Sequence, residues 1–511
     1  MQINVAGWRY RHCDPEPDTG AHQDEQVSPT IGPIYRADPR HNRLLLAARR
    51  LVAIARSPRA HLSYRNAHAM NTPHVSSATA DAMARARVKG NPRQGLVMAT
   101  WGYFIGFAAV ALYGPAAHAF QESMQLSPLL VGLLVAAPQL TGSLLRIPFG
   151  AWVDKSGGRL PMLTLFGVSI VGMWGLVFIL VTVPHVTAAL YPVILLFGFM
   201  SGCGVATFSV GVPQVSYWFP RDRQGTALGV YGGVGNLAPG LFTLLLPFAI
   251  AALGLAGSYL AWLAFLLIGA GVYGWLARDA YYFQLRAHGV SQDEARNVAQ
   301  SLGQQLFPRE SVWGALLMAA DETRTWGLTF LYFVSFGGFL TLTAWFPTYW
   351  INLHHLSLID AGILGGAGFS LLAAVARVGG GSLAERFGGE YMAAISFAVV
   401  LIGAALLTAV TVFEINVAGE LLIGLGMGLA NAAVFKMVPK YVPHAVGGAS
   451  GLVGGLGALG GFVIPPTLGM FAGALGDAGY SGGFFVYVVL AVAAIMVSIG
   501  FIRTRDNVVT A

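Results

Sequence analysis

Two arginines lie inside long apolar segments of the sequence, where a permanent charge is uncommon. Arg146 lies in LVGLLVAAPQLTGSLLRIPFGAWVDKSGG, and Arg377 lies in AGILGGAGFSLLAAVARVGGGSLAERFGG. A cation inside a membrane span costs roughly 2.5 to 3.5 kcal/mol, so it usually faces a bundle interior and marks a substrate or ion path. A guanidinium is planar, permanently charged and able to donate two parallel hydrogen bonds. The pair therefore predicts a binding site for an anion.

The two arginines occupy equivalent positions of an internal repeat. Arg146, Gly150, Asp154 and Gly157 recur 231 positions later as Arg377, Gly381, Glu385 and Gly388. Two further sets recur in the same order at offsets of 232 and 222: Phe104, Gly106, Phe107, Tyr113 and Pro115 as Phe336, Gly338, Phe339, Trp345 and Pro347, and Gly225, Gly229, Gly232, Gly233 and Gly235 as Gly447, Gly451, Gly454, Gly455 and Gly457. Three ordered matches indicate two homologous halves, each contributing one arginine.

The composition indicates that the elements carrying these residues are membrane helices. The chain is 55% hydrophobic and 10% charged with a mean hydropathy of +0.62, whereas soluble domains carry roughly 25% charged residues. Apolar runs long enough to cross a bilayer predict twelve spans, at 97–118, 129–152, 160–183, 188–213, 225–249, 257–277, 325–349, 359–384, 391–413, 417–437, 447–473 and 482–502. We therefore expect an all-α membrane protein with twelve transmembrane helices in two pseudo-symmetric six-helix bundles.

The basic residues outside the predicted spans lie on one side of the membrane. Loops after even-numbered spans contain Lys155, Arg159, Arg221, Arg223, Arg278, Arg286, Arg296, Arg309, Arg324, Arg386 and Lys440, whereas HAFQESMQLS, TVPHVTA, INLHHLS and GALGDAGYSGG after odd-numbered spans contain no Lys or Arg. Because cytoplasmic loops are enriched in Lys and Arg, both termini are predicted to be cytoplasmic, in the cytoplasmic (inner) membrane. The formal net charge of +7 then reflects topology in a lipid bilayer, which excludes a nucleic-acid-binding surface.

Five segments follow from these patterns. They are a basic N-terminal cytoplasmic extension (1–95), a first six-helix bundle (96–277), a cytoplasmic loop between the bundles (278–324), a second six-helix bundle (325–505) and a C-terminal tail (506–511). The extension holds 14 of the 30 Lys and Arg, and its residues 44–62 are compatible with a basic amphipathic helix on the anionic leaflet. The alternatives are a disordered tail, or translation that starts at Met70 or Met83.

The sequence gives no indication of enzyme chemistry. Cys13 and Cys203 offer neither a structural disulfide nor a metal-ligand spacing. No constellation of a nucleophile and a base is recognisable, so we expect no catalytic residue, no metal and no cofactor. The chain is expected to act as a monomer.

A short motif follows the second predicted span and recurs after the eighth. GAWVDKSGGR contains Gly150, Asp154 and Gly157, and GSLAERFGG contains Gly381, Glu385 and Arg386. Both resemble the cytoplasmic signature of the major facilitator superfamily, a Gly-x-x-x-Asp-Arg/Lys-x-Gly pattern. An acidic residue at a helix end beside a basic residue can form charge-assisted bonds between neighbouring helices, and such contacts would stabilise one conformational state.

Two predicted spans are rich in glycine at three- and four-residue spacing. They are GTALGVYGGVGNLAPG (225–240), with Gly229, Gly232, Gly233 and Gly235, and GGASGLVGGLGALGGFVIPP (447–466), with Gly451, Gly454, Gly455 and Gly457. Close helix packing through small residues is the expected role of most of these glycines. Packing does not explain the polar Asn236, whose amide can donate to an anion's oxygen, while flanking glycines let a helix flex.

Several segments together resemble the nitrate/nitrite porter family within that superfamily. They are GSLLRIP, MSGCGVATFSVGVPQVSYWFP, GTALGVYGGVGNLAPG, LYFVSFGGF, AAVARVGGG and GLVGGLGALGGFVIPP, and the resemblance covers residues 96–505. It implies that Arg146 and Arg377 bind the substrate, that Phe208 and Phe336 are aromatic walls on either side of the anion, and that Tyr332 and Asn236 hydrogen-bond it. Ordinary packing is the alternative for the two phenylalanines and for Tyr332. LAPG at 237–240 departs from the family pattern, which has a further glycine there.

The resemblance implies a secondary active transporter of nitrate, nitrite or both that works by alternating access. Nitrate is a planar monoanion, which suits a planar guanidinium donor and flat aromatic walls. A major facilitator carrier for another small anion, such as oxalate or another carboxylate, would also need two arginines. A membrane sensor that binds an anion without moving it is the alternative from a different class.

The coupling mode stays open at this stage. Moving an anion against an inside-negative potential costs roughly 2.3 kcal/mol per 100 mV, so nitrate must enter with protons or in exchange for nitrite. Glu414 and Glu420 fall near the outer end of the tenth predicted span, and no carboxylate falls at mid-membrane, which favours exchange. The connection FKMVPKYVPHAVGGA instead resembles the proton-symport branch of the family.

Overall fold

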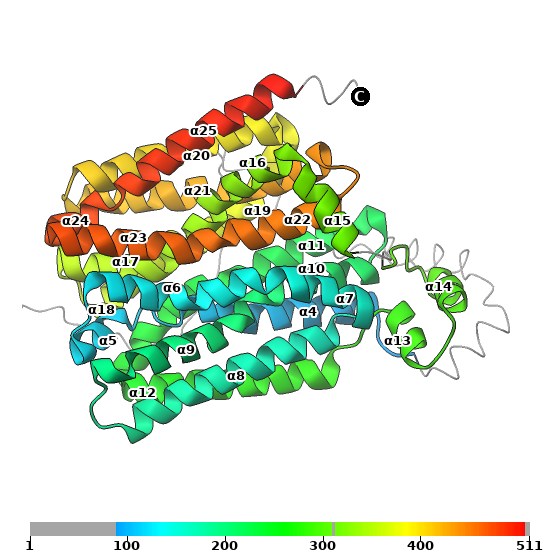
Figure 1. Cartoon of the computed structure of the whole chain (residues 1–511), viewed down its shortest axis with the longest axis horizontal. Coiled ribbons are helices and arrows are strands. Elements are labelled where there is room, and N and C mark those ends of the chain that lie inside the picture. The colour runs from blue at the N-terminus through cyan, green and yellow to red at the C-terminus, as the bar shows by residue number, and fades with distance from the viewer. Residues whose placement is uncertain (1–87, 309–311, 506–511) are drawn as a thin grey trace, which may run out of the picture. The chain divides into compact units, whose positions relative to one another are not determined.

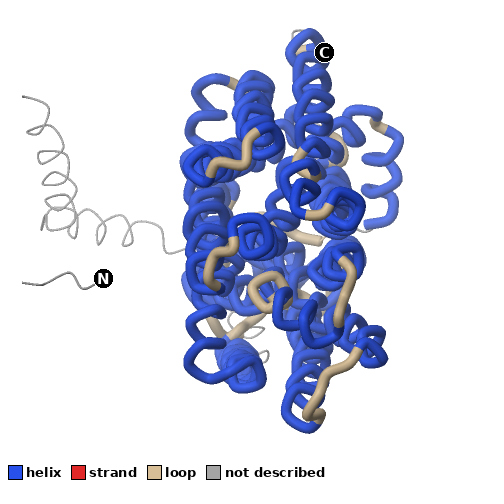
Figure 2. Tube along the Cα trace, turned by 90° about the vertical axis from the view of Figure 1, so that its left-hand side faces the viewer, coloured by secondary structure: helices blue, strands red, loops and turns tan. Residues whose placement is uncertain are grey.

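The structure is a computed structural model that describes residues 88–308 and 312–505. The expected amphipathic segment 44–62, Cys13 and the tail 506–511 lie outside the described residues. Within the described residues, helices are joined by short connections; most of them run side by side in Figure 1 and are seen nearly end on in Figure 2.

The first half of the fold runs from α4 to α12. Its first helix, α4 (Pro92–Phe107), is capped by Asn91, whose Oδ1 accepts the backbone N–H of Gln94 at 2.9 Å, as is usual at a helix N-terminus. The other elements are η1 (Ala108–Ala111), α5 (Ala117–Met124), α6 (Pro128–Leu144), α7 (Arg146–Ser156), α8 (Arg159–Thr182), η2 (Ala188–Leu190), α9 (Tyr191–Gly202), η3 (Cys203–Ala206), α10 (Thr207–Trp218), α11 (Arg221–Gly235) and α12 (Leu237–Leu276).

Short helices connect the halves. They are α13 (Tyr281–Ala287), α14 (Gln292–Ser301) and α15 (Val312–Asp321). Ser291 caps α14 by accepting the backbone N–H of Glu294, and Leu285, Ala295 and Val298 form a small apolar cluster between α13 and α14. The loop between the bundles is therefore largely helical among its described residues.

The second half runs from α16 to α25. Its elements are α16 (Thr323–Tyr332), η4 (Phe333–Gly337), α17 (Gly338–His354), α18 (Leu358–Ile363), η5 (Leu364–Leu371), α19 (Leu372–Phe387), α20 (Gly389–Ala409), α21 (Phe413–Tyr441), α22 (Val446–Leu456), η6 (Gly457–Leu459), α23 (Gly460–Leu475), α24 (Asp477–Gly482) and α25 (Phe485–Thr504). η4 and η5 are π-helical turns, which often occur at functional sites.

The helical stretches confirm the predicted spans. Among the described residues, eleven helical stretches are long and apolar enough to cross a membrane. The fifth runs for 54 residues from Arg223 to Leu276, far more than the roughly 20 residues that one crossing needs. It is interrupted at Gly254, whose φ is +70°, so it provides two crossings and the twelve-helix fold is complete.

One predicted boundary was wrong. The first span was expected to continue to residue 118, but its helix ends at Ala111, and a new helix begins at Ala117. The backbone turns between them where Gly114 lies directly against the backbone of Ala344 in the second half. Pro115 follows and has no N–H to donate to a helix. The chain therefore bends where the two halves touch.

The two halves contact each other mainly at one end, which we call the closed end. There Gly132 of α6 lies against Pro465 of α23, and Gly362 of α18 lies against Pro247 of α12. Glycine permits this close approach because it has no side chain. Toward the other end of the helices, a Cβ placed on Gly225 or Gly229 of α11 would have no described atom within 4 Å. The halves are thus packed together at the closed end and apart along this part of α11.

Candidate functional site

Arg146 is buried where α6 gives way to α7. Helix α6 ends at Leu144, α7 begins at Arg146, and the arginine side chain is 1% exposed. Its Nη1 donates a hydrogen bond of 2.9 Å to the carbonyl oxygen of Gly454 in α22. Gly454 lies in the last turn of its helix, where carbonyls lack intrahelical partners. This bond joins the two halves at the site.

The remaining edge of the Arg146 guanidinium has no partner. Nε and Nη2, which lie on one side of the group, are buried and make no hydrogen bond with the described residues. Leaving a buried donor unpaired costs about 1 to 3 kcal/mol. Two parallel N–H donors in this arrangement match two oxygens of a planar anion.

Arg377 of α19 approaches the same place from the second half. Its Nη1 lies 3.5 Å from the hydroxyl of Tyr332. Its guanidinium lies over the ring of Phe336 at 5.5 Å from the centroid, and that of Arg146 lies over the same ring at 4.9 Å. The equivalent arginines of the two halves therefore meet at one aromatic ring, as the repeat led us to expect.

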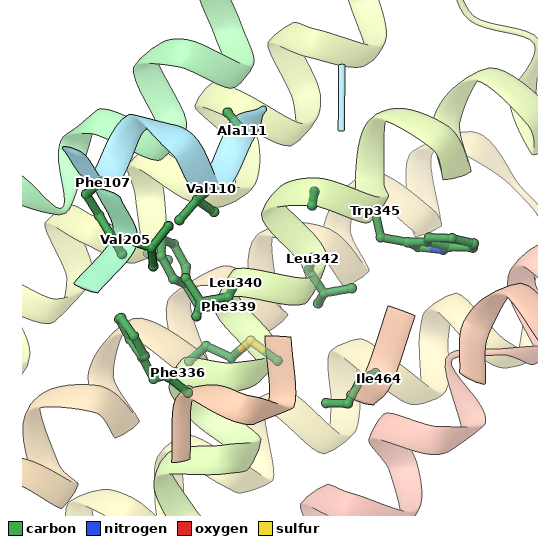
Figure 3. Close-up of a cluster of buried hydrophobic side chains, with 14 of the residues drawn as sticks. Phe107, Val110, Ala111, Val205, Phe336, Phe339, Leu340, Leu342, Trp345 and Ile464 are labelled. Carbon is green, nitrogen blue, oxygen red and sulfur yellow. The ribbon is translucent and has the colours of Figure 1, made fainter. Parts of the chain in front are cut away.

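The aromatic residues form a slot around the guanidiniums. Phe208, 7% exposed, lies 5.1 Å from the Arg146 guanidinium. The centroids of Phe208 and Phe336 are 6.5 Å apart with planes inclined by 33°, and Tyr332 stacks on Phe336 at 4.8 Å. A planar ion between two rings needs about 7 Å, twice a carbon contact of about 3.5 Å, so a small separation of the rings would admit one. Figure 3 shows Phe336 among buried hydrophobic side chains of the core.

Asn236 lies at the C-terminal end of α11 and is 1% exposed. Its Oδ1 accepts a hydrogen bond of 2.9 Å from the hydroxyl of Tyr103, and its Nδ2 has no partner among the described residues. The hydrogen bond from Tyr103 thus fixes the orientation of the Asn236 amide and leaves its Nδ2 group able to donate to a ligand. Tyr103 was missed by the sequence reasoning, although it directly precedes Phe104, a residue of the repeat.

Phe435 of α21 was also missed. It packs edge-on against Phe208 at 6.4 Å and against Tyr332 at 4.8 Å, and it lies 6.0 Å from the Arg377 guanidinium. The three repeat matches do not reach residue 435, so no recognised sequence signal pointed to it.

The glycine helices only partly follow the expectation of close packing. Gly235 lies against the ring of Tyr103, Gly455 against Ile147, and Gly457 against Tyr332. Gly240, Gly448, Gly460 and Gly461 of the same segments are also closely packed. In contrast, a Cβ on Gly229 or Gly232 would have no described atom within 4 Å, and one on Gly233, Gly451 or Gly454 would have a single neighbour at 3.2 to 3.6 Å. The expected close packing is therefore present in much of both segments and absent along part of α11.

The two copies of the cytoplasmic motif differ in their contacts. Asp154 accepts a hydrogen bond of 2.5 Å from Tyr217 of α10, whereas Glu385 and Arg386 are exposed. Both motifs end in a glycine of positive φ, with +79° at Gly157 and +89° at Gly388, a conformation that favours glycine. Gly150 is in ordinary contact with Ser209 of α10, and Gly381 has open surroundings. Both motifs form turns at helix ends.

Asp279 lies between α12 and α13, outside the spans, and holds the first of these turns. Its Oδ1 accepts the backbone N–H of Arg159 at 2.9 Å, and its carboxylate lies against Gly157. Burial raises the pKa of Asp279 above its usual value, and the hydrogen bond from Arg159 opposes this rise. The turn at Gly157 therefore packs against the buried carboxyl group of Asp279.

No carboxylate was expected at mid-membrane, and the structure shows that two carboxylates near the ends of spans are nevertheless buried. Glu420 of α21 is 0% exposed, and Glu390 at the start of α20 is 1% exposed. Glu390 pairs with Lys440 and accepts a hydrogen bond from the Tyr441 hydroxyl, so it is satisfied. Glu420 has no cationic partner among the described residues. Sequence position alone could not reveal this burial, because Glu420 is seven residues into its helix.

This fold defines a class, the membrane transporters of the major facilitator superfamily. The sequence model of the Major Facilitator Superfamily matches residues 99–465 of this chain. Among solved structures, the xylose transporter XylE from E. coli covers 80% of this chain and 97% of its own with a TM-score of 0.60 and 16% identity. The human organic anion transporter MFSD10 covers 80% of this chain and 100% of its own, with a TM-score of 0.54 and 15% identity. At these identities the likeness concerns the fold alone.

Curated relatives narrow the class. The probable nitrate/nitrite antiporter NarK1 of Thermus thermophilus is 32% identical over 399 residues, which are 73% of this chain and 83% of the relative. The probable nitrate/nitrite transporter NarK2 of Mycobacterium tuberculosis is 31% identical over 380 residues, covering 73% and 88%. The probable nitrate transporter NarT of Staphylococcus epidermidis is 27% identical over 374 residues, covering 72% and 87%. The chain belongs to the nitrate/nitrite porter family of the major facilitator superfamily.

Proposed function

We propose that this protein transports nitrate, nitrite or both across the cytoplasmic membrane, holding the anion between Arg146 and Arg377. The observation that carries the proposal is the unpaired Nε–Nη2 edge of Arg146, buried beside Phe336. An anion with two oxygens in one plane satisfies both donors at once. The names of the relatives support nitrate and nitrite as the anions.

The surrounding groups favour a flat monoanion. The rings of Phe208 and Phe336 both contact the Arg146 guanidinium, and their centroids lie 6.5 Å apart. This narrow spacing suits a planar ion better than a tetrahedral phosphate or sulfate. Asn236 Nδ2 and the Tyr332 hydroxyl are the neutral hydrogen-bonding groups. Arg377 adds the second positive charge, which lowers the cost of taking an anion out of water.

Each half contributes one arginine, so binding couples to the relative movement of the halves. In this state the hydrogen bond from Arg146 to Gly454 joins the halves beside the site, and the closed end is packed through Gly132 and Gly362. With both termini in the cytoplasm, the closed end faces outward and the separated part of α11 faces the cytoplasm. An anion that binds both arginines stabilises an arrangement with the halves closed around it, which is the requirement for alternating access.

The proposal extends to the organisation of the chain. The two bundles (96–277 and 325–505) rock against each other about the bound anion. The loop 278–324 joins them on the cytoplasmic side, and a single chain suffices because both arginines are its own.

Uptake into proteoliposomes tests this function. Vesicles loaded with nitrate should accumulate labelled external nitrate by counterflow, and external nitrite should compete whereas oxalate and sulfate should not. Counterflow that oxalate inhibits and nitrite leaves unchanged would make the protein a carboxylate carrier. Nitrate binding without counterflow would make it a sensor.

A further inference from the structure

Glu420 is a buried carboxyl group within a membrane-spanning helix. Its side chain is not part of the anion site. It is 0% exposed, lies on α21, and its Oε2 accepts a hydrogen bond of 3.0 Å from Trp350 Nε1 of α17. Its Oε1 is buried with no hydrogen-bond partner among the described residues. An ionisable side chain inside a membrane marks a functional site by default, because burying its charge is costly.

A second acceptor beside Glu420 also lacks a donor. Asn416 lies one turn earlier on the same face of α21, and its Oδ1 is buried and unpaired. Its Nδ2 contacts the hydroxyl of Tyr349 and, at 3.0 Å, the ring Nε2 of His354. Two buried acceptors on one helix face thus lack a donor, and a proton on Glu420 would turn one of them into a donor.

The elements around the cluster contribute few other titratable groups. Tyr349 and His354 both come from α17, and partly buried His354 ends that helix. η5 faces Glu420 with Gly368, and α20 faces this part of α21 with Gly403 and Leu407. Glu414 lies on the same helix and is exposed. No Lys or Arg among the described residues forms an ion pair with Glu420, so its charge is removed most directly by a proton.

We propose that Glu420 is the proton-binding site of the transport cycle, so that each nitrate enters together with one proton. This rests on the proposed function. On the outer side, a proton from water adds to the Glu420 carboxylate to give the neutral acid. On the cytoplasmic side, the same O–H bond breaks and the proton returns to water.

Charge balance supports one proton for each nitrate. Two guanidiniums and one carboxylate give the empty site a net charge of one positive. One nitrate and one proton leave that charge unchanged, so the empty and loaded proteins carry the same charge through the membrane. Nitrate alone would make the site neutral, and a proton alone would make it doubly positive. The pH gradient therefore drives uptake while the step itself is electroneutral.

Close packing links Glu420 to the anion site. Helix α21 lies against η5 and α19 through Gly424, which contacts Phe369, and Gly428, which contacts Ala373 and Ala376 next to Arg377. Phe369 stacks on Phe339 at 6.0 Å, and Phe339 stacks on Phe336 at 5.9 Å. Figure 3 labels Phe336 and Phe339 in this row. A shift of the π-helical turn η5 on proton binding would reach the ring that both arginines contact.

The test measures two kinds of nitrate uptake by the full-length protein in proteoliposomes. One is accumulation driven by a pH gradient, acid outside, and the other is counterflow at equal pH. Glu420→Gln imitates the protonated acid, so it should lose the pH-driven accumulation and keep counterflow, which moves no net proton. Glu414→Gln, which removes an exposed carboxylate from the same helix, should keep both.

Each other outcome has a defined meaning. Accumulation that still follows the pH gradient in Glu420→Gln overturns the proposal, as does the loss of both activities by a variant that remains folded. A wild-type protein that shows counterflow without any effect of the pH gradient overturns it too, but leaves the proposed function intact. Absence of nitrate counterflow in the wild type instead overturns the proposed function.

A second variant covers the case in which Glu420→Gln does not fold. Trp350→Phe removes the hydrogen bond that stabilises the ionised carboxylate while keeping an aromatic ring. Proton uptake then becomes easier, so the external pH for half-maximal accumulation should move to higher values. An unchanged pH profile in this variant contradicts the proposal.

Discussion

Several residues at the site carry buried hydrogen-bond donors that have no partner in the described protein. The Nε and Nη2 groups of Arg146 and the Nδ2 group of Asn236 are buried donors without partners among the described residues. Such groups are uncommon in folded proteins and each needs an explanation. An anion bound among them is one explanation for all three. The acceptors Glu420 Oε1 and Asn416 Oδ1 are also buried without partners among the described residues, and Glu420 is the one of them that can take up a proton.

Gly235 is the residue whose backbone position most directly controls this donor set. A Cβ at Gly235 would overlap the ring of Tyr103, whose hydroxyl orients Asn236. Gly235→Ala should displace the ring and break that bond. Losing a hydrogen bond of about 1 kcal/mol corresponds to about a fivefold loss of nitrate affinity.

Nitrate titration of the purified protein measures this effect. Gly225→Ala on the same helix is the matched control, because no described atom lies within 4 Å of its Cβ position. Its affinity should equal that of the wild type. Equal affinities in all three proteins would mean that Tyr103 does not orient Asn236 for the anion.

At this scale the residues themselves pointed to the two arginines, and the family resemblance added Phe208, Phe336, Tyr332 and Asn236, but neither indicated Tyr103 or Phe435. A lone arginine in an apolar helix is conspicuous because its burial is costly, and the repeat paired Arg146 with Arg377. Tyr103 and Phe435 are aromatic residues among many, and only the packing of α4 and α21 brings them to the site. Burial of Glu420 was missed for the same reason, since a helix position does not say which face is covered.

At the scale of helices and turns, hydropathy predicts the spans but not their interruptions. The spans follow from hydropathy, because an apolar run of about 20 residues has few alternatives to a membrane helix. The break at 112–116 and the π-helical turns η4 and η5 could not be predicted that way. The break lies where Gly114 of one half meets Ala344 of the other, and η5 packs against α12 of the first half through Gly366 and Leu244. In contrast, η4 packs within its own half, where Gly337 lies against Gly460. Hydropathy carries no information on such contacts.

The turn after α7 should make stability depend on pH through Asp279. Its pKa in the folded protein is raised above the ordinary value of 3.8 by burial. At a pH between the ordinary pKa and the raised pKa, Asp279 keeps its proton in the folded state and has lost it in the unfolded state. The free energy of unfolding therefore falls as the pH rises from 3.8 through the raised pKa, and it is constant below that interval.

Thermal unfolding in detergent at stepped pH measures this dependence. Asp279→Asn removes the titrating group, so the decline of the midpoint across this interval should be smaller than in the wild type. Asp293→Asn, in the exposed part of α14, should keep the wild-type profile. The assignment fails if Asp279→Asn declines as steeply as the wild type.

At the scale of the whole molecule, the two halves must separate at the closed end for an external anion to enter. Gly362 and Pro247 meet there, and the Cβ position of Gly362 lies 3.3 Å from Cβ of Pro247. That separation is close to the 3.5 to 4.5 Å of a disulfide. A cross-link at this pair should hold the closed end shut.

Nitrate counterflow of Pro247→Cys/Gly362→Cys, in a background with Cys13→Ser and Cys203→Ser, tests this movement. Oxidation should nearly abolish counterflow, and a reductant should restore it. Each single cysteine variant should be insensitive to oxidation. Full counterflow by the cross-linked protein would show that the closed end does not open during transport.

The central claim is that Arg146 and Arg377 grip a planar anion through paired hydrogen bonds rather than supply positive charge alone. Nitrate counterflow by Arg146→Lys and Arg377→Lys tests it most directly, because lysine keeps the charge but cannot donate two parallel bonds. Each loss of a charge-assisted bond, about 1.5 to 3 kcal/mol, predicts a fall in nitrate affinity of about one to two decades while the protein remains folded. Near-normal flux and affinity in both lysine variants would contradict the account.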